Sequence, residues 1–561
     1  MFDRAKGWTW LELASAAVLV LTIRGAALAF SGERLAQDPD AYVSLARVWS
    51  RTGTFGVERE SSAEPPSAAT NRLGSLERPE TNPSEEAASA FSDATIAASQ
   101  SGESRSTGNE VAREEPKAAD MGNAPADASR VADDGVIGRP EVRPTAYRPP
   151  FYPALLALLD RLGWLTPLGI GLLNLSAGAG TVLLLGNAIV GRSGRRVAWV
   201  AVVLMAIDPL SVLQSLQAMT ETWATFLAVA GGLAFVRFSR SGPSLGGLAT
   251  GMLFGLGALC RPPLLVWGAL LLLIEAAVIA VAAMKRAKYQ VKTALPRAET
   301  AGNDGGPRDT STSETPIAVG RASSGEEVRP ALRLAGLGLI AAALLATLFP
   351  WGLRNQLVLG EFRVTTTHGG YTLLLANNPS LYRAMRGPGD PRDWLATSPD
   401  FVAMLREADP EPVRQAADEV RRDRAWNDAA KRVIREDPWG FMQSVMMRVG
   451  WFWGLAPHLR DTWSGRLVML AVAAFHGAIF SLAIAAIVRR SVGDRLWWQL
   501  GLLALVLTAM HAIWWSNPRM RTPVAPWICW TAAASVTAFG KSSRPSAESG
   551  SARAAGEPKN G

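Results

Sequence analysis

Long apolar stretches, separated by short polar connections, recur through most of this chain. A hydrocarbon core about 30 Å thick requires about 20 apolar residues in a helical span. Stretches near that length cover residues 8–30, 167–190, 197–216, 222–238, 245–260, 264–284, 332–351, 467–488, 496–515 and 523–539. The pattern therefore predicts an all-α protein, a polytopic transmembrane bundle of about ten or more helices.

Lysine and arginine residues gather in every second connection between these stretches, and positively charged loops mark the cytoplasmic side of a membrane. They are Arg192, Arg195, Arg196, Arg237, Arg240, Lys285, Arg286, Lys288, Lys292, Arg489, Arg490, Arg495, Lys541 and Arg544. The rule predicts a multi-pass protein of the plasma (inner) membrane with both termini in the cytoplasm. The tripeptide Ala27-Leu28-Ala29 also resembles a signal-peptidase site, and cleavage there leaves the remaining topology unchanged.

Two long connections fall on the outer side, at residues 31–166 and 352–466. The first contains a tract from 58 to about 145 with too few large apolar residues to offset the entropy of ordering it. Disorder is predicted for this tract, for the cytoplasmic loop 285–331 and for the tail 541–561. The remaining divisions are a first span at 1–30, spans two to six at 167–284, span seven at 332–351 and three last spans at 467–540. Both outer loops are expected to carry short amphipathic helices.

The net charge of +8 raises the question of a nucleic-acid partner. The basic excess lies in short loops between spans, so we expect contact with membrane lipids and none with nucleic acid. Both cysteines, Cys260 and Cys529, lie in or beside spans, which excludes a disulfide framework and a paired-cysteine metal site.

Two aspartates stand in the first outer loop, soon after the first span. Asp38 precedes Pro39, and residues 42–49 have the pattern of a short amphipathic helix. Proline favours the first position of a helix and aspartate the capping position before it, so Asp38 has a structural interpretation. Asp40 adds a second carboxylate at the membrane surface, where a polar substrate can reach it. Capping and acid/base catalysis are equally open for this pair.

Other polar residues lie where outer segments meet the membrane. Arg148 and Tyr152 flank two prolines before a second amphipathic helix, where Arg148 also suits lipid phosphates. Glu221 opens the fourth span, where its charge stabilises the helix dipole, and it also suits a sugar hydroxyl or a cation. His368 lies in a glycine-rich outer stretch. Residues 388–437 are polar, with a helical pattern, and suit a small subdomain that recognises an acceptor.

Motifs along the chain share an order and spacing with a known family. From Asp38 the first loop reads Asp-x-x-x-Tyr-x-x-x-Ala, and Arg148 opens Arg-Pro-Pro-x-Tyr-Pro-x-Leu-Leu-Ala. Downstream follow Met219-Thr220-Glu221, Leu259-Cys260-Arg261-Pro262, Pro350-Trp351-Gly352-Leu353-Arg354-Asn355, Gly360-Glu361-Phe362, Gly369-Gly370-Tyr371 through Asn377-Asn378-Pro379, and Asn517-Pro518-Arg519-Met520-Arg521-Thr522-Pro523. Over about residues 1–540 the chain resembles the polytopic GT-C glycosyltransferases, which include protein O-mannosyltransferase (glycosyltransferase family 39) and aminoarabinose-transferase relatives. The long insert after Gly56 departs from their pattern.

The resemblance implies transfer of a sugar from a polyprenyl-phosphate carrier to an acceptor hydroxyl on the outer face, with inversion. A carboxylate takes the acceptor's proton; the family pattern gives that role to Asp38, and Asp40 is the second catalytic candidate. Arginines, whose planar fork fits phosphate oxygens, stabilise the leaving phosphate. The implied substrate-binding residues are Tyr42, Arg148, Tyr152, Glu221, Arg261, Arg354, His368, Arg519 and Arg521.

The implied partner is a lipid-linked hexose or pentose donor, and glycan, lipid and protein acceptors of the cell envelope all remain open. No cofactor is certain. The two nearby carboxylates leave a divalent cation open, although they lack a clear set of further ligands. A polytopic transporter or lipid flippase is the competing class, but the sequence shows no internal symmetry of the kind transporters have. A non-catalytic scaffold is the third class, and tolerance of substitution at Asp38 would favour it.

Overall fold

The computed structural model describes residues 7–30, 34–58, 141–299, 329–388, 391, 399–411, 413–457 and 463–542. The first half contains α1 (Trp10–Ala29), η1 (Arg34–Ala36), α2 (Tyr42–Thr52), β1 (Gly56–Glu58), β2 (Val142–Pro144), α4 (Phe151–Arg161), α5 (Pro167–Ser193), α6 (Arg195–Ile207), α7 (Pro209–Ser215), α8 (Glu221–Phe238), α9 (Leu245–Cys260) and α10 (Pro263–Glu299). The second half contains α11 (Pro330–Leu359), α12 (Gly369–Ala376), α13 (Pro379–Arg386), α15 (Pro399–Ala408), α16 (Ala416–Glu436), α17 (Pro438–Phe452), α18 (Trp463–Val488), α19 (Arg495–Ile513), η2 (Pro518–Val524) and α20 (Ala525–Ser542).

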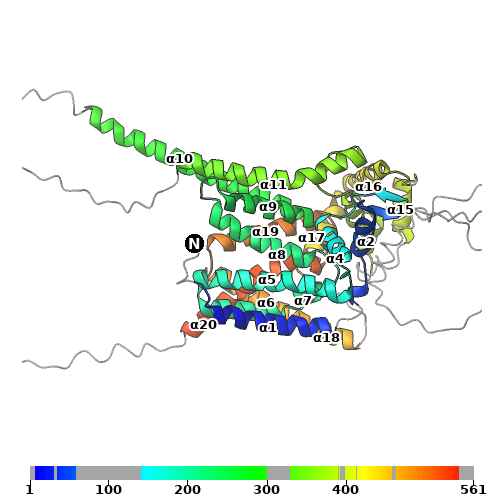
Figure 1. Ribbon diagram of the computed structural model, residues 1–561, viewed down its shortest axis with the longest axis horizontal. Coiled ribbons are helices and arrows are strands. Elements are labelled where there is room, and N and C mark those ends of the chain that lie inside the picture. The colour runs from blue at the N-terminus through cyan, green and yellow to red at the C-terminus, as the bar shows by residue number, and fades with distance from the viewer. Residues whose placement is uncertain are drawn as a thin grey trace, which may run out of the picture.

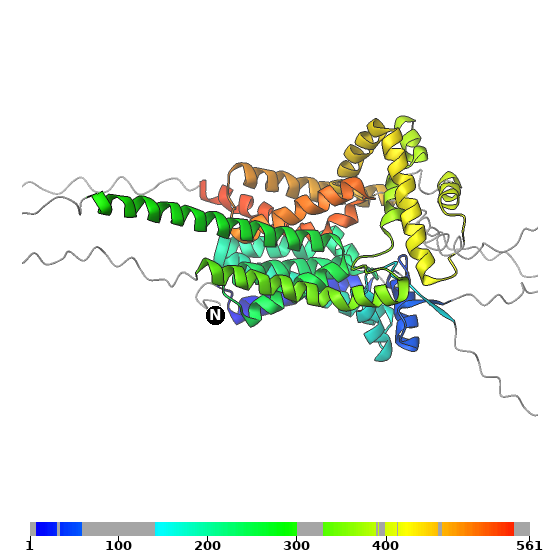
Figure 2. The same ribbon diagram turned by 90° about the horizontal axis from the view of Figure 1, so that it is seen from above.

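The long helices run side by side in one bundle, seen from two directions in Figures 1 and 2. α9 packs against α8 and α11, α5 against α6 and α8, and α20 against α6 and α18. Small residues permit close approach: a Cβ atom on Gly251 of α9 would lie 2.2 Å from the carbonyl oxygen of Ile340 in α11. Such contacts are typical of helix packing within membranes.

The predicted all-α membrane bundle is confirmed, and the chain is an integral, multi-pass membrane protein. Among the described residues, six helices are long and apolar enough to cross a membrane, and a seventh crossing results if α6 and α7 form one span bent by 55°. The break lies at Asp208-Pro209, where proline cannot continue the hydrogen-bond ladder of α6. The other three predicted stretches form α8, α9 and α20, which lie in the same bundle but do not meet the same length and composition criteria.

Short helices gather at one end of the bundle, which is the right-hand end in Figures 1 and 2. They include the two predicted amphipathic helices, α2 and α4, which pack on each other. α2 begins at Tyr42, three residues later than Pro39 suggested. β1 and β2 pair antiparallel beside them, with Val57 opposite Arg143.

The predicted disordered tracts lie largely outside the described residues. Regular structure covers part of each tract's edges, where disorder is predicted. Glu58 ends β1 and Val142–Pro144 forms β2. α10 continues to Glu299 and α11 begins at Pro330 within the predicted cytoplasmic loop, and α20 reaches Ser542 in the predicted tail. The division of the chain into loops and spans otherwise stays a prediction.

The first described residues and the end of α20 lie at the same end of the bundle, opposite the short helices (Figure 1). Which end faces the cytoplasm stays a prediction from the loop charges, and cysteine labelling tests it. Cys260 and Cys529 are buried, so they give little background. Exposed Arg383→Cys on α13 should react with a membrane-impermeant reagent in intact cells, whereas exposed Lys285→Cys on α10 should react only after permeabilisation. The reverse pattern would invert the topology.

Candidate active site

Charged side chains from five separate segments meet at the end that carries the short helices. Asp40 Oδ1 lies 2.8 Å from Arg148 Nη2, and Asp40 Oδ2 lies 3.5 Å from Arg519 Nη2. Glu221 Oε1 lies 3.3 Å from Arg261 Nη1 and 3.7 Å from Arg519 Nε. Arg519 therefore joins the two carboxylates into one cluster, which we call the arginine cluster: Asp40, Arg148, Glu221, Arg261 and Arg519.

The ends of helices position these side chains. Glu221 is the first residue of α8, and Arg261 is the C-cap of α9, which ends before Pro262 and Pro263. Arg519 follows Pro518 at the start of η2. Asp40 precedes Ala41, which has a left-handed backbone with φ of 58°. This conformation is strained for a residue with a Cβ atom, and such strain is concentrated at functional sites.

Aromatic rings hold Arg148 in place beside Asp40. Its Nε donates a hydrogen bond to the Asp40 carbonyl oxygen at 3.0 Å, in addition to the ion pair with the side chain. Its guanidinium carbon lies 5.5 Å from the ring centre of Tyr42 and 4.9 Å from that of Tyr147. Cation–π contacts of this kind stabilise a partly desolvated guanidinium. Arg148 is therefore fixed, and it fixes Asp40 in turn.

The electrostatic balance of the arginine cluster is positive. Three guanidinium groups face two carboxylates, and Glu221 is almost fully buried. Burial raises the pKa of Asp40, but Arg148 and Arg519, with smaller contributions from His368 and Arg261, outweigh it and hold that pKa below its ordinary value. Asp40 is therefore ionised at neutral pH, and the three guanidinium groups leave the cluster with a net positive charge.

Three buried atoms of the cluster have no hydrogen-bond partner within the described residues. They are Glu221 Oε2, Arg261 Nη1 and Arg519 Nε. Unsatisfied buried polar groups are costly and usually have a functional explanation. Together with the net positive charge, they indicate a site for a ligand that carries both a negative group and hydrogen-bond donors.

His368 lies at the edge of the cluster, and its role in substrate binding stays a prediction. Its ring centre is 4.3 Å from that of Tyr147 and 5.1 Å from that of Tyr371. Burial, and then the charge of Arg148, lower the pKa of His368 well below its ordinary value, although Asp40 opposes this shift. The imidazole is therefore neutral at pH 7, and its buried Nδ1 has no partner in the described part of the chain.

Asp38 is turned away from the arginine cluster and caps α2. Its Oδ1 accepts from the Val43 amide at 3.0 Å, and its Oδ2 accepts from the amide and the hydroxyl of Ser44, both at 2.8 Å. The assignment of Asp38 as the general base stays untested. These bonds nevertheless support the capping interpretation, and Asp40 becomes the stronger catalytic candidate.

The capping interpretation makes a quantitative prediction. Asp38→Ala should lower the free energy of unfolding by about 1 kcal/mol, because the amides of α2 lose their acceptor. Asp38→Asn should retain most of that stability and near-normal activity, because asparagine caps helices about as well. Thermal unfolding and a transfer assay on matched preparations separate the two. A folded but inactive Asp38→Asn protein would return the catalytic role to Asp38.

Two predicted arginines lie outside the cluster and have structural contacts. Arg354 donates to the carbonyl oxygens of Thr145 at 2.8 Å and Phe55 at 2.6 Å, which ties α11 to the segments around the strand pair. Arg521 is 2% exposed and donates to the carbonyl oxygen of Phe452 at 2.9 Å. Both side chains donate to backbone carbonyl oxygens, although Arg521 Nη2 has no hydrogen-bond partner among the described residues. Their role in substrate binding stays a prediction.

The two predicted tyrosines pack against each other beside the arginine cluster. Tyr42 and Tyr152 pack edge to face with ring centres 5.5 Å apart. Tyr152 is fully buried, and its hydroxyl donates to Asn174 Oδ1 at 3.3 Å. Tyr42 contacts Arg148 directly, whereas Tyr152 supports Tyr42 from within the core.

The sequence analysis missed two residues that shape this site. The Tyr147 ring contacts the Arg148 guanidinium and packs edge to face with the His368 ring. Its place next to Arg148 in the motif is a signal that was available. Glu419 of α16 accepts from Thr145 Oγ1 at 2.6 Å and from the Ala146 amide at 3.0 Å, and it also contacts the Thr367 hydroxyl. It thereby joins the segments that lead to Arg148 and His368. Nothing in the sequence near Glu419 indicates that role.

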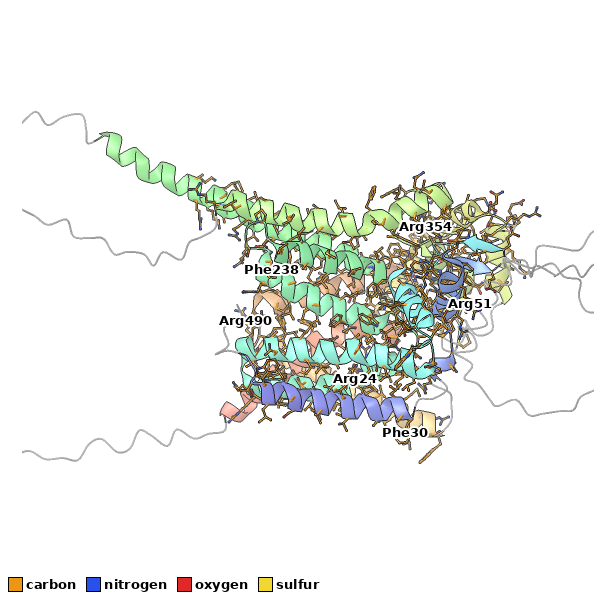
Figure 3. All side chains as sticks on the ribbon, viewed as in Figure 1. Arg24, Phe30, Arg51, Phe238, Arg354 and Arg490 are labelled. Atoms are coloured by element: carbon orange, nitrogen blue, oxygen red, sulfur yellow. The ribbon has the colours of Figure 1, made fainter. Side chains whose placement is uncertain are left out.

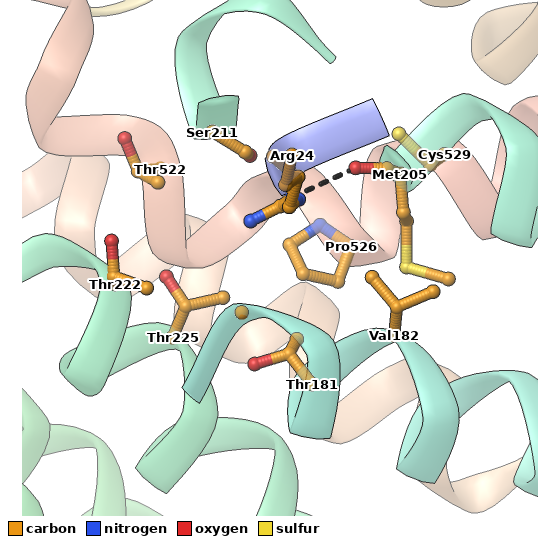
Figure 4. Close-up of a pocket in the computed structure, with 12 residues that line it drawn as sticks. Arg24, Thr181, Val182, Met205, Ser211, Thr222, Thr225, Thr522, Pro526 and Cys529 are labelled. Atoms are coloured by element: carbon orange, nitrogen blue, oxygen red, sulfur yellow. Dashed lines mark hydrogen bonds between the residues drawn. The ribbon is translucent and has the colours of Figure 1, made fainter. Parts of the chain in front are cut away.

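A small cavity lies inside the bundle (Figure 4). Arg24 of α1 points into it and donates to the Met205 carbonyl oxygen at 2.9 Å. Five hydroxyl side chains, those of Thr181, Ser211, Thr222, Thr225 and Thr522, share the lining with apolar groups such as Val182, Ala525 and Pro526. Its volume of about 20 Å³ holds about one water molecule. Thr222 directly follows Glu221, so water here would lie close to the buried carboxylate.

Metal binding remains a hypothesis. Within the described residues, no group of three or more His, Cys, Asp or Glu side chains is arranged to hold a metal ion. The carboxylates of Asp38 and Asp40 also face different partners, amides in one case and arginines in the other. They are therefore not arranged as a shared cation site.

Comparison with known proteins gives one structural similarity. No protein-family model matches the sequence, and neither does any curated protein. Among solved structures, the chain is similar to the crystal structure of ArnT from Cupriavidus metallidurans bound to undecaprenyl phosphate. The TM-score is 0.26 and the sequence identity 12%, over 71% of this chain and 69% of that chain. Similarity at this level assigns no activity and no residue, so the functional conclusion depends on the geometry of the site.

Proposed function

We propose that this protein is a membrane glycosyltransferase that moves a sugar from a polyprenyl-phosphate carrier to an acceptor hydroxyl on the outer face. The observation that carries the proposal is the arginine cluster, which unites a first-loop carboxylate with three arginines from distant segments. It lies at the end of a membrane bundle, where a lipid-linked phosphate has its head group. The motif resemblance to GT-C glycosyltransferases supports the same activity.

The reaction needs two kinds of group, and the cluster supplies both. The acceptor oxygen attacks the anomeric carbon, and the bond from that carbon to the carrier phosphate breaks with its electron pair on the phosphate. Arg519 and Arg261 stabilise the charge that develops on the leaving phosphate. Asp40 takes the proton of the acceptor hydroxyl. Attack opposite the leaving group inverts the configuration.

Donor binding also improves Asp40 as a base. In the free protein, the ion pairs with Arg148 and Arg519 keep the pKa of Asp40 low, which makes the carboxylate a weak proton acceptor. A phosphate that draws Arg519 toward itself removes one of these two charges. The pKa of Asp40 then rises toward the range of a useful general base. The coupling favours proton transfer only when the donor is present.

The outer helices α12, α15 and α16 suit recognition of the acceptor. They pack on one another beside the segment that carries His368, and α16 is tied to it through Asp423, which accepts from the Gly370 amide at 2.6 Å. The acceptor class, the identity of the sugar, the divalent cation and the inner-membrane location all remain part of the proposal.

The direct test is transfer in vitro. Purified protein is given a panel of polyprenyl-phosphate sugars together with membrane extracts, and released polyprenyl phosphate and new glycoconjugates are measured. Turnover of at least one lipid-linked sugar supports the proposal. If no donor is consumed while labelled lipid crosses proteoliposome membranes, the protein is a flippase. The break between α6 and α7, a feature of some transporters, gives that alternative its structural basis.

A further inference from the structure

A second group of arginines lies at the end of the bundle opposite the arginine cluster. Glu275 of α10 is within 3.5 Å of Arg240, 3.4 Å of Arg333 and 2.6 Å of Arg495. These arginines come from the connection after α8, the first turn of α11 and the first residue of α19. Figure 3 labels Phe238, close to this group, at the opposite end of the bundle from Arg354.

The length of α8 places this group at the other membrane surface. The helix has 18 residues, so it is about 27 Å long. That length is close to the thickness of the hydrocarbon core, about 30 Å. Glu221 opens α8 in the arginine cluster, and Arg240 follows its last residue by two positions. The two groups are therefore separated by about one membrane.

The charges of this group do not balance. Three guanidinium groups surround one carboxylate, whose side chain is 7% exposed. Asp494, beside Arg495, pairs with Arg192 at 2.6 Å and offers no direct contact to the group in the described residues. Uncompensated charge beside a membrane interior is costly. Arg333 Nε is also buried without a hydrogen-bond partner in the described residues. An additional anion would compensate the excess positive charge and would accept a hydrogen bond from Arg333 Nε.

The surroundings indicate an anion with apolar chains. Arg240 is 59% exposed, so a ligand can reach the group from outside the bundle. Large apolar side chains are exposed on the same helices: Leu273 and Ile274 on α10, Leu332 and Leu334 on α11, and Trp498 on α19. A phosphate group would meet the arginines while acyl chains cover these side chains. Free phosphate would leave them uncovered.

We propose that Arg240, Arg333 and Arg495 form a binding site for the phosphate head group of an anionic membrane lipid, with Glu275 compensating one of the three positive charges. Basic pockets between helices near the cytoplasmic surface bind anionic lipids in this way. The site is independent of the proposed glycosyl transfer and lies at the other membrane surface.

Native mass spectrometry of the full-length protein tests the site, with phosphatidylglycerol, phosphatidylcholine and inorganic phosphate as separate probes. Phosphatidylglycerol should be retained in preference to the other two. Arg240→Gln and Arg333→Gln should each weaken its retention about tenfold, since each removes a charge-assisted hydrogen bond. Arg383→Gln, an exposed arginine on α13 at the other end, is the matched control and should change nothing. Because Arg240 is largely exposed, its loss should leave folding intact.

Glu275→Gln separates a lipid site from a simple ion-pair lock, in which Glu275 and the three arginines only hold the ends of their helices together. With a lipid site, removing the competing carboxylate should leave retention of phosphatidylglycerol equal or higher. With a lock, Glu275→Gln should reduce that retention, because the three arginines lose the carboxylate with which they all pair. Equal retention of phosphatidylglycerol and phosphatidylcholine by the wild type, or unchanged retention in the Arg240→Gln, Arg333→Gln double variant, would overturn the proposal. Phosphate binding as tight as that of the lipid would overturn the choice of a lipid.

Discussion

Asp40→Asn is expected to reduce sugar transfer by roughly 10²–10⁴-fold, the usual contribution of a positioned acid/base group. Asparagine has the size of aspartate and retains contacts with Arg148, but it cannot take the proton of the acceptor hydroxyl. The loss should therefore appear in turnover, while donor binding is retained or strengthened because a negative charge has left the site. Steady-state kinetics and an equilibrium binding assay with the donor measure the two effects separately.

Asp38→Asn is the matched control for this substitution. It makes the same chemical change two residues away, on a carboxylate that contacts only Val43 and Ser44 among the bonds described above. Thermal unfolding should show both variants folded. Near-normal transfer by Asp40→Asn would remove Asp40 from the mechanism, and normal transfer by both variants would exclude a first-loop base altogether.

Arg519→Gln is expected to lower turnover about 10²–10³-fold, the typical effect of removing one group that stabilises transition-state charge. Arg519 contacts both Asp40 and Glu221 at long range, and its Nε is free of hydrogen bonds in the described residues, so it has capacity left to bind phosphate. Arg519→Lys should recover only part of the rate, because an ammonium lacks the planar fork.

The pH dependence gives this prediction a second readout. Arg519 lowers the pKa of Asp40, so its removal should raise that pKa. Activity needs the ionised carboxylate and is lost as pH falls through its pKa, so the acid limb of the rate profile should move to higher pH in Arg519→Gln. Arg424→Gln, an exposed arginine on α16, is the control. An unshifted acid limb together with a normal rate would exclude Arg519 from the site.

The sequence predicted the bundle well because the apolar stretches are long. It also predicted a site made of first-loop carboxylates and outer arginines. Asp40, Arg148, Arg261 and Arg519 do meet, together with Glu221, whereas Asp38, Arg354 and Arg521 have other partners. The resemblance to a family gave these residues as a set. From periodicity alone, each residue would have been interpreted separately, as a helix cap or as a contact with lipid head groups.

What the sequence could not decide is which of two near neighbours faces the site. Asp38 and Asp40 are two residues apart, and the left-handed turn at Ala41 sends their side chains to different partners. Arg519 and Arg521 are also two residues apart, on a 3₁₀ helix with about three residues per turn, so they point in different directions. Such choices depend on local backbone angles, which composition and spacing do not determine.

The arginine cluster is assembled from both ends of the polypeptide. Asp40 follows the first helix, whereas Arg519 directly precedes the last one. During synthesis from the N-terminus, Asp40 and Glu221 enter the membrane region long before Arg519 exists. A chain interrupted before η2 would keep a nearly buried Glu221 with one fewer positive partner, which makes an incomplete product easier to unfold and to degrade. The ion pairs of Arg519 with Asp40 and Glu221 would then stabilise only the completed chain, in addition to their role in the site.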